Sequence, residues 1–206
     1  MTGQDHRMSF LFVGNHACLD FINTQLVVNE RPVDLLNTFS HLVTWLRQAE
    51  VLGEEDAKTI DRLWSGQAKG EQTLTEARAF RATLREMVER IAARKPVPQT
   101  VVDAINHQLR HRIGYSQLTR RKRQFERGFK AESRDATQLL GLLAEAASDL
   151  LCTCELSLIK KCQNPACVLF FYDTTKNHTR HWCSMSLCGN RHKVAAHYRR
   201  RRTKST

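Results

Sequence analysis

The sequence has no hydrophobic run long enough to cross a membrane. Its apolar stretches fall well short of the about 18 residues that a transmembrane helix needs, and the mean hydropathy is −0.47. Near the N-terminus, His16 and Asp20 interrupt the apolar stretch that begins with residues 10–13, before it can serve as a signal-peptide core. We therefore expect a cytoplasmic protein that does not bind membranes.

The common signatures of enzymes are also missing. The sequence contains no glycine-rich phosphate-binding loop, no nucleophile elbow, no HExxH pair and no paired-carboxylate motif. We therefore expect that the chain is not an enzyme. The alternative is an active site in the N-terminal region, which a zinc ion with an exchangeable water would support.

Acidic residues are almost absent from the last part of the chain. Residues 160–206 contain eleven Lys and Arg against one acid, Asp173, a net charge of +10 out of +11 for the whole chain. The first 159 residues are therefore close to neutral. Such an asymmetry is typical of a segment that binds a polyanion.

The pattern of apolar residues before this basic segment is mostly helical. We expect a helix over residues 34–49 with Asp34 as its cap and Gly53 after its end, and a second over 54–64. Thr73 and Glu76 have capping-box spacing ahead of a long amphipathic helix that must stop near Lys95, because prolines follow. Further helices are expected over residues 101–109 and from about residue 135 to 150.

Residues 112–130 have a different pattern, which favours a β-hairpin that turns at the basic run 120–123. Residues 110–130 carry eight Lys and Arg against Glu126, so the hairpin either extends a nucleic-acid surface or has a charged tip that discourages edge pairing. The predicted fold is mainly α with a small β-hairpin. It has a helical domain over residues 1–155, followed by a small treble-clef or zinc-ribbon-like four-cysteine module over residues 156–206.

Four of the seven cysteines form the pattern C-x4-C-x15-C-x4-C. Two close pairs joined by a longer segment are how one chain supplies the four tetrahedral thiolates that structural zinc prefers. Gly189 follows the second pair and can take a positive φ. The predicted ligands of one structural Zn²⁺ are Cys162, Cys167, Cys183 and Cys188.

Two alternatives to this site remain open. The four cysteines could be buried free thiols or form an incidental disulfide, or one of them could be replaced by a nearby histidine. The candidate histidines are His178, His181, His192 and His197. The remaining cysteines are expected to be core or surface thiols, with the last two as weak competitors for the metal: Cys18, Cys152 and Cys154.

The residues around these cysteines resemble the CGNR-type zinc finger of bacterial proteins. The recognisable elements are Cys162, Cys167, Asp173, Arg180, Trp182, the run 183–185 and the run Cys188–Gly189–Asn190–Arg191. The opening GNHACLDFINT, residues 14–24, resembles the start of the ABATE domain that accompanies this finger. Thr175 stands where serine is expected, which keeps a hydroxyl. The resemblance implies a stress-induced transcription regulator.

The end of the chain also predicts a basic helix. Asn190 is a good N-cap for a helix over residues 191–202, whose one face is basic around the small Ala196. Arg180 and Arg191 have an alternative role, which is to support the zinc site through hydrogen bonds to Asp173 or to carbonyl groups. The predicted nucleic-acid contacts are Arg180, Arg191, His192, Lys193, Arg199, Arg200, Arg201 and Arg202.

Several other polar and aromatic residues have two possible roles. Trp182 and the run 170–172 could stack on bases, but we expect them to form the small core of the module. Asp20 and Asn23 could line a ligand pocket, but we expect them to cap or pack.

The sequence thus predicts a zinc-dependent DNA-binding transcription regulator, with an RNA- or ribosome-associated factor as the alternative. A homo-oligomer formed through the N-terminal domain is possible, and the sequence identifies neither a small-molecule effector nor an operator.

Overall fold

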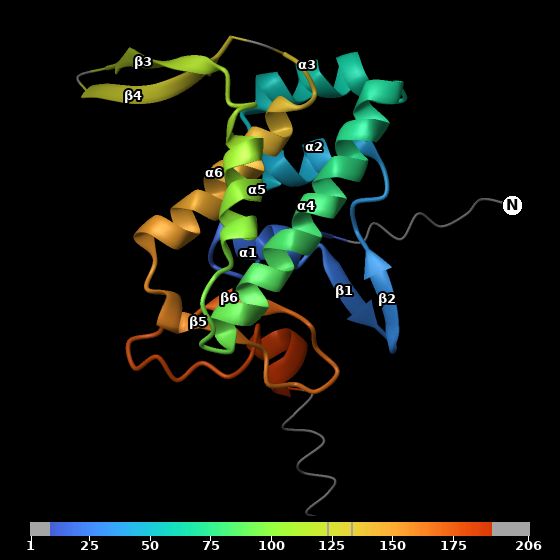
Figure 1. Ribbon diagram of the computed structural model, residues 1–206, viewed down its shortest axis with the longest axis vertical. Coiled ribbons are helices and arrows are strands. Elements are labelled where there is room, and N and C mark those ends of the chain that lie inside the picture. The colour runs from blue at the N-terminus through green and yellow to red at the C-terminus, as the bar shows by residue number, and fades with distance from the viewer. Residues whose placement is uncertain (1–8, 123, 133, 191–206) are drawn as a thin grey trace, which may run out of the picture.

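Helices make up most of the structure, and short antiparallel hairpins connect or flank them (Figure 1). The computed structural model describes residues 9–122, 124–132 and 134–190 of the chain. Within these residues, no helix combines the length and the apolar character needed to cross a membrane. The α-helices are α1 (Ala17–Ile22), α2 (Phe39–Gln48), α3 (Glu54–Trp64), α4 (Ala68–Ala92), α5 (Gln99–Leu109) and α6 (Gln138–Thr153).

The remaining elements form three separate two-stranded sheets and two short helical turns. Each sheet pairs consecutive strands in antiparallel register, so no crossover connection occurs in them. The strands are β1 (Gln25–Val28) with β2 (Arg31–Asp34), β3 (Gly114–Arg121) with β4 (Gln124–Ala131), and β5 (Ile159–Lys161) with β6 (Phe170–Tyr172). The turns are η1 (Leu156–Leu158), a 3₁₀-helix, and η2 (Met185–Gly189), a single π-helical turn.

The long helix α4 is the centre of the helical body, and it contacts each of the five other described α-helices. Its apolar side chains recur every three or four residues, which places them on one buried face. The buried apolar residues of α4 are Leu74, Ala77, Phe80, Leu84, Met87, Val88 and Ile91. The predicted amphipathic helix, the predicted mainly α fold and the hairpin over residues 112–130 are confirmed, and α3 has the predicted bounds.

The helix predicted from residue 34 begins later than expected. Asp34 ends β2, where its carboxylate is bound by Arg81 and accepts from the amide of Leu36 at 3.0 Å, and the helix does not begin until Phe39. The N-cap of α2 is instead Thr38, whose hydroxyl accepts a hydrogen bond from the amide of His41 at 3.2 Å. The prediction that Gly53 closes this helix is also wrong, because α2 ends at Gln48 and Gly53 is the N-cap of α3.

The predicted capping box at Thr73 and Glu76 is wrong as well. Helix α4 begins at Ala68, and the hydroxyl of Thr73 donates to the carbonyl of Lys69 at 2.9 Å within the helix. Gly70 lies inside α4, at a position where a Cβ would collide with the carbonyl oxygen of Trp64, the last residue of α3. This glycine therefore allows α3 and α4 to pack closely rather than ending a helix.

Helix α1 and the β1–β2 hairpin were not predicted from the sequence. Helix α1 has only six residues and is capped by His16, whose ring nitrogen accepts from the amide of Cys18 at 3.2 Å. The β1–β2 turn consists of Asn29 and Glu30, both with positive φ, 49° and 64°. A non-glycine pair in this conformation is uncommon, so the turn carries little sequence signal.

Candidate metal centre

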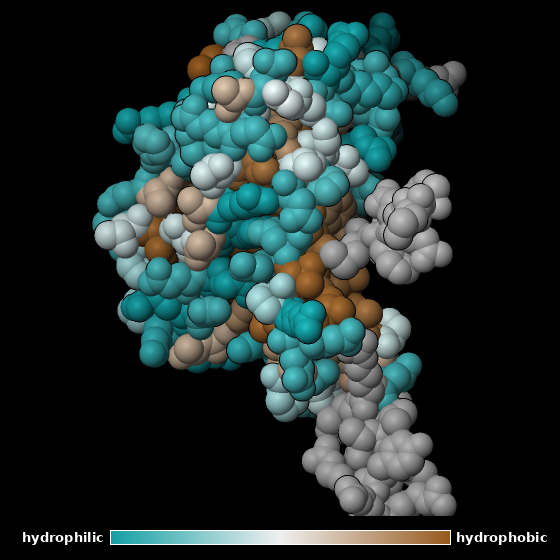
Figure 2. Space-filling model, turned by 90° about the vertical axis from the view of Figure 1, so that its right-hand side faces the viewer, coloured by the Kyte–Doolittle hydropathy of each residue, from teal (hydrophilic) through white to brown (hydrophobic). Residues whose placement is uncertain are grey.

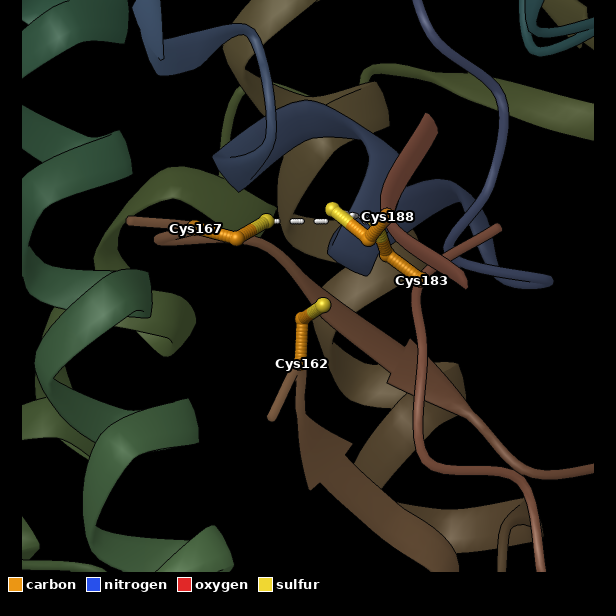
Figure 3. Close-up of side chains that lie close together, drawn as sticks. All are labelled: Cys162, Cys167, Cys183 and Cys188. Atoms are coloured by element: carbon orange, nitrogen blue, oxygen red, sulfur yellow. Dashed lines mark hydrogen bonds between the residues drawn. The ribbon is translucent and has the colours of Figure 1, made fainter. Parts of the chain in front are cut away.

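Four sulfur atoms converge beside β5 and β6 (Figure 3), which lie at the opposite end of the molecule from the β3–β4 hairpin (Figure 1). The Sγ atoms of Cys162, Cys167, Cys183 and Cys188 all lie within 4.8 Å of one another, and we call this group the sulfur cluster. The Sγ of Cys183 is 3.8 Å from that of Cys167 and 3.6 Å from that of Cys188. Sulfurs bound at about 2.3 Å to one tetrahedral ion lie about 3.8 Å apart, so the cluster has the size of a four-thiolate zinc site.

The first cysteine pair lies in the loop that connects β5 to β6. The amide of Cys162 donates to the carbonyl of Leu169 at 2.9 Å, and the amide of Cys167 donates to the carbonyl of Asn164 at 2.8 Å. The side chain of Asn164 accepts from the amide of Ala166 at 3.1 Å and donates to the Sγ of Cys188 at 3.4 Å. The Asn164 turn therefore shapes the first loop and also contacts the second cysteine pair.

The second pair lies at the π-helical turn η2, with Cys183 just before the turn and Cys188 inside it. The hydroxyl of Ser184 caps this turn, and the amide of Cys188 donates to the carbonyl of Ser184 at 3.0 Å. Gly189 does not have the positive φ that was expected. A Cβ there would lie 2.6 Å from the Sδ of Met185, which is the end of a half-exposed side chain that has room to shift.

The thiols of the cluster influence one another strongly. Hydrogen bonds from the thiols of Cys167 and Cys183 lower the pKa of Cys162. The bond to Cys162 raises the pKa of Cys167 to about 12, and it raises the pKa of Cys183 as well. The protein alone thus favours one thiolate among these three thiols. Four adjacent thiolates need a bound cation, which is the charge that a zinc ion supplies.

A buried carboxylate holds the loop between β6 and the second pair. Asp173 is fully buried and accepts hydrogen bonds from the Lys160 ammonium at 2.7 Å and from the Thr175 hydroxyl at 2.6 Å. It also accepts from the backbone amide of Arg180 at 2.9 Å. Burial alone would raise the pKa of Asp173, but these hydrogen bonds lower it below its usual value. The hydroxyl of Thr175, which stands where serine was expected, therefore helps to stabilise this buried carboxylate.

The guanidinium of Arg180 has a supporting position. Its Nε donates to the carbonyl of Trp182 at 2.9 Å, and its Nη2 donates to the carbonyls of Val13, at 2.9 Å, and Cys183. Its Cζ also lies 4.2 Å from the centre of the Phe171 ring. These contacts favour the predicted structural role of Arg180 over a nucleic-acid contact.

The described part of the four-cysteine module, residues 156–190, packs directly on the N-terminal part of the chain, and we call it the sulfur module. The side chain of Asn23 donates to the carbonyl of Phe170 at 2.8 Å and accepts from the amide of Phe170 at 3.0 Å. The amide of Tyr172 donates to the carbonyl of Gly14 at 2.8 Å. Asp20 is buried and accepts from the amide of Gly14 at 2.7 Å. Asp20 and Asn23 therefore have packing roles, as expected.

The aromatic run 170–172 is part of the interior. Phe170 and Phe171 are 1% and 0% exposed, which removes these two side chains from base stacking, and Phe171 has the predicted place in the core of the module. Phe171 lies in a small buried group with Leu169 and three cysteines, while Phe170 joins the core of the helical body.

The other candidate ligands lie outside the sulfur cluster. Cys18 is buried, and burial raises the pKa of its thiol to about 12, whereas Cys152 is exposed. His178 directs its Nδ1 to the carbonyl of Asp173 at 3.2 Å. Among the described residues, the one group of three or more possible ligands consists of the four cysteines.

Beside the cluster, a cavity of about 340 Å³ separates it from the β1–β2 hairpin. Its apolar lining includes Leu11, Leu26 and Leu187, and its polar lining includes Asn29 and Asn164. Figure 2 views the molecule from the side of β1 and β2, and hydrophobic surface is visible in the lower part of that face. This cavity was not predicted from the sequence, because its walls come from segments that lie far apart in the chain.

Most of the predicted nucleic-acid contacts lie outside the described residues. The described residues end at Asn190, the predicted N-cap. The backbone of Asn190 is in the helical region. The predicted contacts beyond it are Arg191, His192, Lys193, Arg199, Arg200, Arg201 and Arg202, and the two later histidines are His192 and His197.

Comparison with known protein families gives two matches. Residues 15–153 match ABATE, described as "putative stress-induced transcription regulator", and residues 159–201 match the CGNR zinc finger. Neither is a family of enzymes. No curated protein matches the chain. The zinc-finger match and the geometry of the sulfur cluster together support one structural zinc ion.

Proposed function

Because the chain belongs to the ABATE family and ends in a CGNR zinc finger, we propose that it is a zinc-dependent, DNA-binding transcription regulator. In this proposal residues 1–155 form a domain that senses a stress signal or dimerises, and residues 156–206 form the domain that binds DNA. Cys162, Cys167, Cys183 and Cys188 are the zinc ligands.

The observation that supports the proposal is the positive charge of the sequence that contains the four clustered cysteines. Residues 160–206 have a net charge of +10, and a zinc ion with four thiolates adds −2, which leaves about +8. Four consecutive arginines, residues 199–202, exceed what a solvated helix end needs. A surface of this kind binds phosphates and releases counterions, so affinity falls steeply with salt.

The zinc site has a structural role in this mechanism. Four sulfur ligands complete a tetrahedral zinc and leave no open position for water or substrate. Asn164 donates a hydrogen bond to one of these sulfurs, and Arg180 joins the backbone before Cys183 to that of Val13. These contacts hold the described part of the module, up to Asn190, in a fixed arrangement around the metal site.

The test is recovery of nucleic acid by the zinc-loaded full chain from a mixture of fragmented genomic DNA and total RNA. We expect enrichment of a subset of DNA sequences, and loss of this enrichment in Cys183→Ser. Cys152→Ser is the matched control, because Cys152 is exposed and outside the cluster. Recovery dominated by RNA would replace the proposal by an RNA-associated function. Absence of any binding at low salt would end both.

A further inference from the structure

The described residues of the β3–β4 hairpin form no buried face, although its two strands are longer than those of the other described sheets. We call it the β3–β4 ribbon. It extends from the helical body at the end that holds α3 (Figure 1). All residues of β4 are exposed, and so are residues 115–120 of β3. A two-stranded ribbon that is solvated on both faces gains little from its own packing, so its length points to a partner.

The register separates two faces of different chemistry. Residues opposite each other share a face, and side chains alternate between faces. Leu118 pairs with Arg127, and Arg120 pairs with Phe125, so these four residues lie on one face. Phe129 lies on the same face, opposite Ser116. The full set of this face, which we call the arginine–phenylalanine face, is Gly114, Ser116, Leu118, Arg120, Phe125, Arg127, Phe129 and Ala131.

The arginine–phenylalanine face combines exposed apolar groups with cations and contains no acid. Leu118 is 66% exposed, Phe125 62% and Phe129 39%. The Cζ of Arg120 lies 5.5 Å from the ring centre of Phe125, and that of Arg112 lies 3.7 Å from the ring centre of Phe129. Exposed apolar side chains next to cations mark an interaction surface. The opposite face holds Glu126 as well as Tyr115 and Lys130.

From this arrangement we propose that the β3–β4 ribbon is a second DNA contact, which inserts its arginine–phenylalanine face into a groove of duplex DNA. The major groove admits a two-stranded β-ribbon, arginines bind guanine edges there, and phenylalanine contacts the methyl group of thymine. Residues 110–130 carry eight Lys and Arg against one acid, which complements the phosphates on both sides of the groove. A second copy of the ribbon fits less well, because pairing two such faces would oppose like charges.

The position of the ribbon predicts the size of the binding site. The ribbon and the sulfur cluster lie toward opposite ends of the long axis, and α4 runs between these ends (Figure 1). The 25 residues of α4 span about 37 Å at about 1.5 Å per residue. This length is close to one turn of B-DNA, about 34–36 Å. We therefore expect protection that extends about one helical turn beyond the site of the zinc finger.

The test uses the zinc-loaded full chain and a duplex that the wild-type protein selects from fragmented genomic DNA. It therefore rests on the proposed function. We expect Arg127→Gln to weaken binding about tenfold and to remove the outer part of the footprint. Lys130→Gln is the matched control, because it removes one positive charge from the same strand on the opposite face. The loss of affinity in Lys130→Gln should be less than half of the tenfold loss expected for Arg127→Gln, and the footprint should stay intact. Unchanged thermal unfolding shows that both variants fold.

A second measurement does not depend on affinity. A photo-crosslinking residue at position 118, on the arginine–phenylalanine face, should attach to the duplex, whereas one at position 117 should attach much less. If the wild type binds the duplex but Arg127→Gln matches it in affinity and footprint, the ribbon proposal is overturned and the proposed function stands. Crosslinks from position 118 to a second protein chain would also overturn it. If the wild type selects no duplex, both fail together.

Discussion

The helical body and the sulfur module are built on different amounts of buried surface. The core of the helical body joins buried apolar side chains from all six described α-helices. The buried group of the module consists of Leu169, Phe171 and three of the four clustered cysteines. A core of that size does not fold a domain by itself. The helices therefore stabilise one another, whereas the module depends on its metal and on contacts with the helical body.

Removal of zinc is the strongest way to separate the two regions. A chelator should unfold the module, because structural zinc contributes about 10–16 kcal/mol in small zinc fingers, while far-ultraviolet circular dichroism still shows most of the helical content. DNA binding should be lost at the same time. Readdition of zinc should restore it. If removal of the metal also abolished the helical signal, the helical body would depend on zinc, and the expected difference between the two regions would be wrong.

The opposite change should weaken only the body. Leu84 is fully buried in α4, and Leu84→Ala should cost about 2–5 kcal/mol of unfolding free energy while the zinc content stays at one ion per chain. The measurements are denaturant unfolding and metal analysis. Leu118→Ala is the control, because Leu118 is exposed and its truncation should cost less than about 0.5 kcal/mol. A zinc-deficient Leu84→Ala protein would show that the regions are not separable.

A smaller effect is expected at the junction between the two regions. Asn23→Ala leaves the buried amide and carbonyl of Phe170 without their partner, at about 1–3 kcal/mol for each group. Hydrogen exchange at β6 should accelerate along with this loss of stability. The control is Asn106→Ala on the exposed surface of α5. Equal stability of the two variants would mean that the Asn23 bonds do not hold the module in place.

The smallest expected effect is a pH dependence from Asp20. Burial raises the pKa of Asp20 to about 6 from 3.8, against hydrogen bonds from Gly14 and Val13 and the charge of Arg180. The folded state therefore binds the proton more tightly, so stability should fall as pH rises from about 4 to about 6 and stay level above that. Asp20→Asn should flatten this slope and be more stable at pH 7 by about 1–3 kcal/mol. Thermal melts across this range check it, with Asp103→Asn as the control for loss of one charge.

The sequence predicts best what depends on neighbours in the chain. The cysteine spacing predicted the sulfur cluster because each pair closes a short loop. The bounds of α3 were predicted because Gly53 lies directly before it. The ribbon followed from its alternation between Gly114 and Gly128. In each case the signal lies within a few residues of the element that it predicts.

Contacts between distant segments could not be predicted in this way. Asp34 resembled a helix cap, but Arg81 in α4 binds its carboxylate 47 positions away. Asn23 and Phe170 are 147 positions apart, and nothing near either of them indicates the other. Lys160 was likewise missed as the partner of Asp173. These pairs depend on how the helices pack, which a single sequence does not specify by periodicity.

The position of Arg180 has a practical consequence for any attempt to produce the finger as a separate fragment. One of its three carbonyl acceptors is that of Val13, which a fragment starting at residue 156 would not contain. Phe170 would be exposed in the same fragment. Its backbone amide and carbonyl would form hydrogen bonds with water instead of with Asn23. Such a peptide lacks contacts that hold the module in the whole protein, so the intact chain is the proper material for testing the proposed DNA binding.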